Sequence, residues 1–423
     1  MNDFVIRGDI AYCPTKEQLI AVEDGFLVVR GGLCELVCTE LPQSAQGLPV
    51  HDHRGKLVLP GMADLHIHAP QYAYRGLGAD MELLDWLEHY AFREEAKYAD
   101  LSYADRAYTI FADALKNSAT TRAVIFGTIH TDATRLLMDK MEESGLVSYV
   151  GKVNMDRNSP KALTETTEGS FRETVRLIRE TADRYRSTRP IITPRFVPSC
   201  TDELLSRLGR LAEKEALPVQ SHLSENPGEI AWVKELCPDS RFYGEVYDRS
   251  GLFGGSIPTV MAHCVYSSDE EIALMKERGV TVAHCPASNM NVASGIAPIR
   301  RYLDLDLRVG LGSDVAGGHT VSLFTAMAEA MQLSRMYWRH LDSTKKPLTF
   351  SEALYMATKG GGGFFGKVGS FEPGYECDAV VIDDSTLPHP QELTLLQRVE
   401  RAVWLGGDRT GLSAKYVRGQ KIL

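Results

Sequence analysis

The chain has 423 residues, of which 44% are hydrophobic and 24% are charged, a composition typical of a soluble globular protein with a large buried core. This composition excludes intrinsic disorder, and the length fits a barrel of about 250 to 300 residues with a smaller companion domain. The net charge of -10 and the absence of a Lys/Arg cluster argue against a nucleic-acid partner.

The first residues, MNDFVIRGDIAYC, lack the basic start and the apolar core of a signal peptide, and no window of about 18 residues is continuously apolar. We therefore expect a cytoplasmic protein without a membrane partner. The eight cysteines include no C-x-x-C pair, so we expect free thiols. Cys34 and Cys38 lack the second ligand pair that a structural zinc site requires.

The two ends of the chain carry similar strand patterns that turn at glycine. These are LVVRGGLCELV at residues 27–37 and AKYVRGQKIL at residues 414–423. Neither end offers enough strands to be stable alone. We therefore predict one small β-sandwich domain built from residues 1–56 and 366–423.

Between the ends, eight strand-like runs alternate with helical stretches, as repeated βα units do. The runs are LVLPGMADLHIH, TTRAVIFGTIH, SYVGKVNMD, IITPRFVPS, LPVQSHLSE, PTVMAHC, VTVAHC and RVGLGSDV. They predict an α/β protein with a (β/α)8 TIM barrel over residues 57–365. The segment 80–91, DMELLDWLEHYA, has the apolar spacing of a helix packed on such a barrel. A doubly wound nucleotide-binding sheet is disfavoured because its glycine fingerprint and the P-loop pattern are absent.

Histidines and an aspartate stand at the ends of the predicted strands, where a barrel enzyme places its active site. They are His66 and His68 on the first strand, His222 on the fifth, His263 on the sixth, His284 on the seventh and Asp314 on the eighth. Side chains two residues apart on a strand point the same way, so the H-x-H pair can share one ion. With His222 and Asp314, this pair offers nitrogen and oxygen ligands that suit zinc first, with iron or manganese as alternatives. Each residue alone is more often a satisfied polar side chain, but burying them together is costly without an ion or full hydrogen bonding.

Two positions remain open from the pattern alone. The tripeptide AHC occurs at the ends of both the sixth and the seventh strand, so either His263 or His284 could be the functional histidine. Cys264 and Cys285, which follow them, are more typical of buried thiols than of nucleophiles. Glu225 lies just past the fifth strand and is either a proton shuttle, if burial raises its pKa, or a surface glutamate capping the next helix.

The motifs PGMADLHIHAPQ, TPRF, SHLSEN, MAHCVYSS, AHCPASNM and GSDVAGG stand in the order and spacing of the amidohydrolase superfamily. The chain resembles this superfamily over essentially its whole length, including VGSFEPGYECDAVVID, which is similar to the segment that returns to the small β-domain. Within the superfamily, DLHIHAPQY, PRF and SHLSEN are most similar to the motifs of members that deaminate guanine.

The resemblance implies one zinc ion per chain, or Fe²⁺, and a hydrolytic deamination at C2 of guanine that yields xanthine and ammonia. It also implies a homodimer. The implied metal ligands are His66, His68, His222 and Asp314; the implied catalytic residues are Glu225, His263 and Asp314; and the implied substrate contacts are Gln71, Arg195, Phe196, His222, Glu225 and Asp314. His284 matches no ligand.

The chain departs from the superfamily pattern at residues 119–122, where Ala-Thr-Thr-Arg replaces G-T-T-T, and at the glycine-rich KGGGGFFG. These departures concern the local loop conformation and not the reaction class. Two other functions share the fold: deamination or dechlorination of a related heterocycle such as 8-oxoguanine or a triazine, and a catalytically silent scaffold. Arg195 and Gln71 are the residues that would discriminate guanine from the related heterocycles. The complete set of metal ligands argues against the catalytically silent scaffold.

Overall fold

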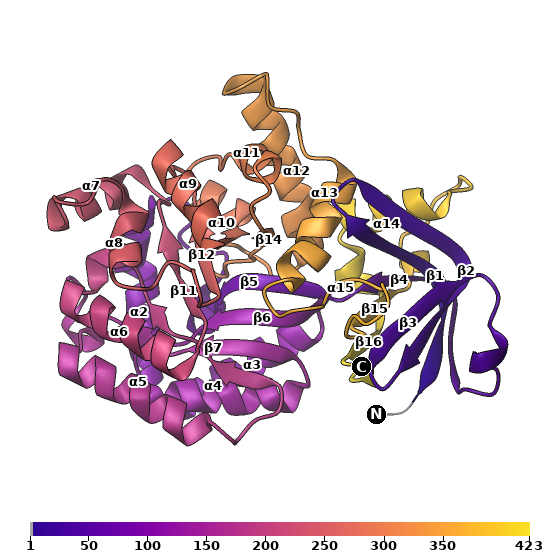
Figure 1. Cartoon of the computed structure of the whole chain (residues 1–423), viewed down its shortest axis with the longest axis horizontal. Helices are drawn as coiled ribbons and strands as arrows, with labels where there is room; N and C mark the ends of the chain where they lie inside the picture. The colour runs from indigo at the N-terminus through magenta and orange to yellow at the C-terminus, as the bar shows by residue number, and fades with distance from the viewer. Residues whose placement is uncertain (1–2) are drawn as a thin grey trace.

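The structure is a computed structural model that describes residues 3–423 as a barrel beside a smaller sheet (Figure 1). Eight parallel strands form the barrel in the order β11-β12-β13-β14-β5-β6-β7-β9, and a bridge between Ile192 and Val219 closes it. The strands are β5 (Met62–His68), β6 (Thr120–Phe126), β7 (Val147–Gly151), β9 (Thr188–Pro190), β11 (Val219–Leu223), β12 (Thr259–His263), β13 (Thr281–His284) and β14 (Val309–Leu311). The predicted (β/α)8 barrel is confirmed.

Helices surround the barrel and lie between successive strands along the chain (Figure 1). They are α3 (Leu101–Lys116), α4 (Thr131–Ser144), α5 (Thr167–Thr181), α6 (Asp202–Glu215), α7 (Pro227–Leu236), α8 (Tyr243–Arg249), α9 (Asp269–Arg278), α10 (Pro286–Asn291), α11 (Ile299–Asp304), α12 (Leu323–His340) and α13 (Phe350–Tyr355). Helix α3 shows why these segments are helical: the Asp100 side chain caps its first turn, and Ala104, Tyr108, Phe111 and Leu115 form one buried stripe.

Strands β5, β6 and β11 are buried on both faces, which explains their continuous apolar runs. Two short strands, β8 (Val153–Asn154) and β10 (Thr193–Pro194), pair beside β7 and β11 and extend the barrel wall. Because all eight strands run in the same direction, their carboxyl ends meet at one mouth. The residues that follow these ends therefore converge, although they are far apart in the sequence.

The smaller sheet is built from both ends of the chain, as predicted. Its strands are β1 (Phe4–Thr15), β2 (Gln18–Arg30), β3 (Leu33–Cys38), β4 (Val50–Pro60), β15 (Ala379–Ile382), β16 (Leu412–Val417) and β17 (Gln420–Lys421). Hydrogen bonds join all seven into one mixed sheet, where a sandwich would have two separate sheets. The predicted glycine turns are present, at Gly31 and Gly32 between β2 and β3 and at Gly419 between β16 and β17. Helices α14 (Leu395–Trp404) and α15 (Gly407–Gly411) lie between β15 and β16 in the chain.

An ion pair buried between the two parts accounts for one departure from the superfamily pattern. Arg122 of β6 is 1% exposed and donates to Asp378, which is also 1% exposed, over 2.6 and 3.0 Å. The same guanidinium donates to Glu376 over 2.7 Å. Both acids lie directly before β15, on the segment that returns to the small sheet. Arginine at this position therefore joins the barrel to the small sheet.

Residues 83–95 form one continuous helical stretch, as the apolar spacing of segment 80–91 predicted, but it lies over the barrel mouth and not on the outside of the barrel. It forms α1 (Leu83–Trp86) and a π-helical turn (Leu87–Ala91), followed by α2 (Phe92–Glu95). Leu83, Trp86 and Leu87 line a pocket at the barrel mouth. This segment covers the mouth, and the outer helix after the first barrel strand is α3.

All eight cysteines are free, as predicted. Among residues 3–423, none of the helices combines the length and the apolar character needed to cross a membrane.

Replacing Asp378 with Asn should lower the free energy of unfolding by about 3 to 5 kcal/mol, because Arg122 would lose the fully buried one of its two carboxylates and keep only the partly exposed Glu376. Urea unfolding of the purified variant measures this change. Asp52→Asn is the control, since Asp52 pairs with Arg54 over 2.8 Å in an exposed position and should change stability little. Equal losses in the two variants would contradict the role of the buried pair.

Candidate metal centre and pocket

Five side chains converge at the carboxyl ends of the barrel strands, and together they are called the imidazole–carboxylate cluster. They are His66 and His68 at the end of β5, His222 on β11, His263 at the end of β12 and Asp314 after β14. His263 and Asp314 have backbone φ angles of 73° and 45°, in the left-handed region that non-glycine residues rarely adopt. Such backbone strain persists where the surrounding structure holds a functional side chain in place.

The polar atoms of the cluster lie at the distances expected of neighbours around one ion. The Nε2 atoms of His68 and His222 are 3.2 Å apart. Asp314 Oδ1 is 3.1 Å from His66 Nε2 and 3.5 Å from His68 Nε2. Ligand atoms held tetrahedrally at about 2.0 to 2.1 Å from a zinc ion are separated by about 3.3 Å. The geometry fits a four-ligand site.

The protonation of the imidazoles fits the same interpretation. His222 Nδ1 donates to the Arg195 carbonyl oxygen over 2.6 Å, so His222 Nε2 is the unprotonated nitrogen that faces His68. His66 Nε2 is buried without a hydrogen-bond partner. Burial lowers the pKa of His66, and it lowers the pKa values of His68 and His222 well below the usual range. Three neutral imidazoles and a carboxylate form a suitable donor set for a divalent cation.

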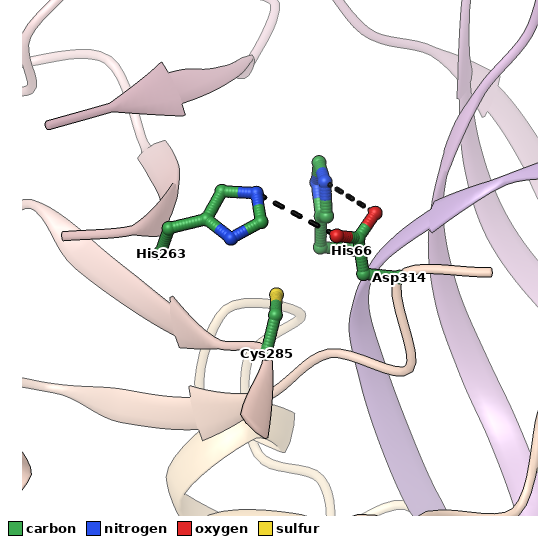
Figure 2. A group of neighbouring side chains, drawn as sticks. All are labelled: His66, His263, Cys285 and Asp314. Carbon is green, nitrogen blue, oxygen red and sulfur yellow. Dashed lines mark ion pairs between the residues drawn. The ribbon is translucent and has the colours of Figure 1, made fainter. Parts of the chain in front are cut away.

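His263 lies between two carboxylates at the edge of this set. Its Nε2 atom is 3.4 Å from Glu225 Oε2 and 3.6 Å from Asp314 Oδ2. Its Nδ1 atom is 2.9 Å from Asn289 Oδ1, so the Asn289 oxygen accepts from Nδ1 and leaves Nε2 directed at the carboxylates. Figure 2 shows the imidazoles of His66 and His263 both directed at the Asp314 carboxylate.

The repeated tripeptide Ala-His-Cys presents different residues from β12 and β13. His263 of β12 belongs to the cluster, whereas β13 presents Cys285 to it (Figure 2). His284 lies instead in a separate pocket beside Arg300. The Cys285 thiol is 3.5 Å from the Ala283 carbonyl oxygen, and burial raises its pKa well above the usual range, so it stays protonated. The two tripeptides pair in register, with Ala262 opposite Ala283, and they differ in backbone conformation: His263 and Cys264 have left-handed φ angles of 73° and 49° at the end of β12.

Glu225 is buried, which excludes a role as a surface helix cap; the side chain of the next residue, Asn226, caps α7 instead. Burial raises the pKa of Glu225 to about 7. Ser294 donates to its Oε1 over 2.9 Å, so Oε2 is the oxygen nearer to His263. A carboxyl group with a pKa near neutrality can both accept and donate a proton at this place.

A pocket adjoins the cluster at the barrel mouth. The predicted substrate residues Gln71, Arg195 and Phe196 all line it, together with Glu225 and Asp314. All are at most 5% exposed. The structure thus brings every predicted site residue except His66 to the lining of one pocket, and His66 lies beside Asp314 of that lining; His284 lies outside it.

The sequence interpretation missed three buried acids near the site: Glu229, which lines the pocket and accepts from the Glu225 backbone N–H over 3.0 Å, and Asp64 and Glu95. Asp64 accepts from the Ser313 backbone and hydroxyl groups over 3.0 and 2.5 Å and so fixes the loop that carries Asp314. Its position two residues before His66, on the same strand face, could have indicated this role. Glu95 accepts from both Gln71 and Arg195. No local sequence signal indicated Glu95, which lies 24 and 100 residues from these partners.

The barrel, the imidazole–carboxylate cluster at its mouth and the buried Glu225 together define the class of metal-dependent hydrolases. The sequence profile of the Amidohydrolase family matches residues 57–409, and the chain belongs to this family.

Named relatives match nearly the whole chain. It is 38% identical to the guanine deaminase of Dictyostelium discoideum over 92% of this chain and 87% of that protein. It is 34% identical to the guanine deaminase of Escherichia coli (strain K12), over 95% and 91% of the two chains. The crystal structure of guanine deaminase from C. acetobutylicum with guanine bound in its active site is 48% identical and superimposes with a TM-score of 0.97 over 100% of both chains.

Replacing His68 with Ala should lower the zinc content of reloaded protein from about one ion per chain to well below one, because a ligand nitrogen is lost. Elemental analysis after removal of free zinc measures this content. His284→Ala is the control and should keep the wild-type content, since His284 lies outside the cluster. Less than about 0.2 zinc per chain in the wild type would contradict the site.

Proposed function

We propose that the protein deaminates guanine hydrolytically, converting guanine and water to xanthine and ammonia. The observation that carries this proposal is the single pocket in which Glu225 and the imidazole–carboxylate cluster adjoin Arg195 and Gln71. Such a cavity offers groups for hydrolysis and groups that recognise a polar heterocycle. Similarity to guanine deaminases over nearly the whole chain supports guanine as the substrate.

His66, His68, His222 and Asp314 would hold one metal ion per chain, and their nitrogen and oxygen donors suit zinc, with Fe²⁺ as the alternative. A zinc ion at this position would act as a Lewis acid that lowers the pKa of water from 15.7 to about 7.

Glu225 moves the protons of the reaction. The attacking water adds at C2, the ring carbon that bears the amino group, and Glu225 accepts its proton and returns it to the adjacent ring nitrogen. A second transfer, through Glu225 or Asp314, protonates the amino group, which leaves as ammonia. His263, between these two carboxylates, orients the water. A carboxyl pKa near 7 lets Glu225 both accept a proton and donate it again.

Arg195 and Gln71 recognise the opposite edge of the base. When C2 faces the cluster, O6 and N7 face the rest of the pocket, and both are acceptors. The Arg195 guanidinium offers donors in a rigid fork, whereas the amino group of adenine in the place of O6 would meet these donors unfavourably. Phe196 offers a ring face for stacking.

Three wider properties belong to the same proposal. The chain divides into a barrel at residues 57–365 and a small β-domain at residues 1–56 and 366–423. The enzyme is a cytoplasmic homodimer, and its only partners besides the second subunit are the purine base and water.

Ammonia release from guanine, 8-oxoguanine, adenine, cytosine and the triazine ammeline tests the substrate. We expect release from guanine far above the other four. Release from another ring alone would overturn the substrate and keep the hydrolase chemistry, and silence on all five would favour a non-catalytic scaffold.

Replacing Glu225 with Gln should retain the metal and reduce kcat by about 10²- to 10⁴-fold, because an amide cannot exchange the protons that the reaction moves. Steady-state ammonia release and metal content, measured on the same preparation, test this expectation. Glu245→Gln, at a glutamate of α8 outside the pocket, should behave like the wild type. Turnover by Glu225→Gln near the wild-type rate would contradict the shuttle.

Replacing Arg195 with Ala should raise KM for guanine by about 10- to 100-fold and narrow the preference for guanine over adenine, because a buried acceptor of the base loses its donor. Parallel kinetics on both bases measure the preference. Arg157→Ala is a matched control, since Arg157 donates to the Val197 carbonyl oxygen over 3.0 Å and does not line the pocket. An unchanged preference would mean that another residue recognises O6.

A further inference from the structure

Glu95 joins the two polar residues that recognise the base in the proposed function. Gln71 Nε2 donates to Glu95 Oε1 over 2.9 Å, and Arg195 Nη1 donates to Glu95 Oε2 over 2.5 Å. Each carboxylate oxygen therefore has one donor. Glu95, Gln71 and Arg195 are 1%, 2% and 3% exposed, so water cannot replace these contacts. Glu95 itself does not line the pocket.

The contact with Glu95 determines which way the Gln71 amide points. A carboxylate only accepts hydrogen bonds, so the amide nitrogen must face Glu95. At the other end of the amide, the Ala316 backbone N–H donates to Gln71 Oε1 over 3.3 Å. Both ends are held, and the reversed amide would place its oxygen against the carboxylate. One N–H of Gln71 remains to meet a ligand.

The Arg195 guanidinium is held on its edge and on its face by one short helix. Glu95 binds the edge, and the Phe92 ring centroid lies 5.0 Å from the Arg195 Cζ atom. Both residues belong to α2. A guanidinium has five N–H donors, so those not used by Glu95 are available for a ligand in the pocket.

The charges of Glu95 and Arg195 also decide what kind of ligand the pocket can take. A buried guanidinium without a counter-ion would favour an anionic ligand, whereas this one already has a carboxylate within hydrogen-bond distance. The Arg195–Glu95 pair is neutral in sum, yet it still presents directed N–H groups. It therefore suits carbonyl oxygen and ring nitrogen acceptors of an uncharged base.

We infer that Glu95 is a specificity-determining positioning residue: it orients Arg195 and Gln71 so that their N–H groups meet the oxygen-bearing edge of a neutral purine. The inference rests on the proposed function for the identity of the base. It adds a residue outside the pocket that sets the direction of the recognition groups.

The test replaces Glu95 with Gln, which has the same shape but only one acceptor oxygen. That oxygen can serve Arg195 or Gln71 but not both, and the new NH₂ group would face the other donor. Two probes report the result by isothermal calorimetry on zinc-loaded protein: hypoxanthine, which has O6 and N7, and unsubstituted purine, which lacks O6. We expect hypoxanthine affinity to fall by about tenfold or more and purine affinity by less than about threefold, because only hypoxanthine loses the charge-assisted hydrogen bond to O6, while N7 is common to both probes.

Kinetics provide a second readout that a merely structural role would not move. In Glu95→Gln, KM for guanine should rise by about tenfold or more while kcat stays within about threefold, since the groups that carry the reaction are unchanged. Glu94→Gln is the matched control: Glu94 lies on the same helix and is also buried, but it pairs with Lys97 over 2.7 Å and with Tyr103. It should leave both probes and both kinetic constants near their wild-type values.

A double variant keeps the test decisive if the single variant Glu95→Gln does not fold because the charge of Arg195 is no longer compensated. In the Arg195→Ala background, adding Glu95→Gln should reduce hypoxanthine affinity by no more than about threefold, because the main residue through which Glu95 acts is already absent. Additive losses, an equal loss for both probes or no loss at all would overturn the inference. If the wild type releases no ammonia from guanine but the contrast between the probes persists, the proposed function fails and the role of Glu95 stands.

Discussion

The site depends on one physical constraint, that charged and polar side chains buried at the barrel mouth need partners in place of water. Asp64 obtains them from Ser313, and Glu225 obtains one from Ser294. The Nε2 atoms of the three ligand histidines are the exception: His66 Nε2 makes no hydrogen bond, although Asp314 Oδ1 lies 3.1 Å away, and the Nε2 atoms of His68 and His222 face each other. The acids therefore have hydrogen-bond partners, whereas these imidazole nitrogens do not. This contrast identifies the place for a cation.

The sequence predicted the barrel and the cluster because both follow from chain direction. Parallel strands end at one mouth, so His66, His222 and Asp314 had to converge once the strands were recognised. The choice between His263 and His284 could not be predicted from spacing, because the two residues are in register on neighbouring strands and differ in the left-handed backbone conformation of His263. The role of Glu95 could not be predicted for a different reason: its contacts form only when the segment before α3 folds over the barrel mouth.

The helical stretch of residues 83–95, which covers the barrel mouth, determines both the apolar lining of the pocket and the orientation of Arg195. Residues of α1 and the π-helical turn close the pocket with apolar side chains, and α2, which follows directly, supplies Phe92 and Glu95 to Arg195. One stretch of chain thus excludes water and orients the recognition groups. The hydrogen bonds gain strength from that exclusion, because the surroundings have a low dielectric constant. If the residues that close the pocket and the residues that orient Arg195 lay on separate loops, each loop would have to be held in place independently.

The same balance of charges is found where the barrel meets the small sheet. Arg122 has two acidic partners, Glu376 and Asp378, so its buried charge is fully compensated without any ligand. Arg195 is compensated by Glu95 through one of its terminal nitrogens. The difference separates a structural arginine from one that can recognise a substrate: Arg122 donates from Nε and Nη2 to two acids, whereas Arg195 donates from Nη1 to a single carboxylate, which cancels the charge and leaves N–H donors unoccupied. A neutral base can use those donors without bringing a charge into the pocket.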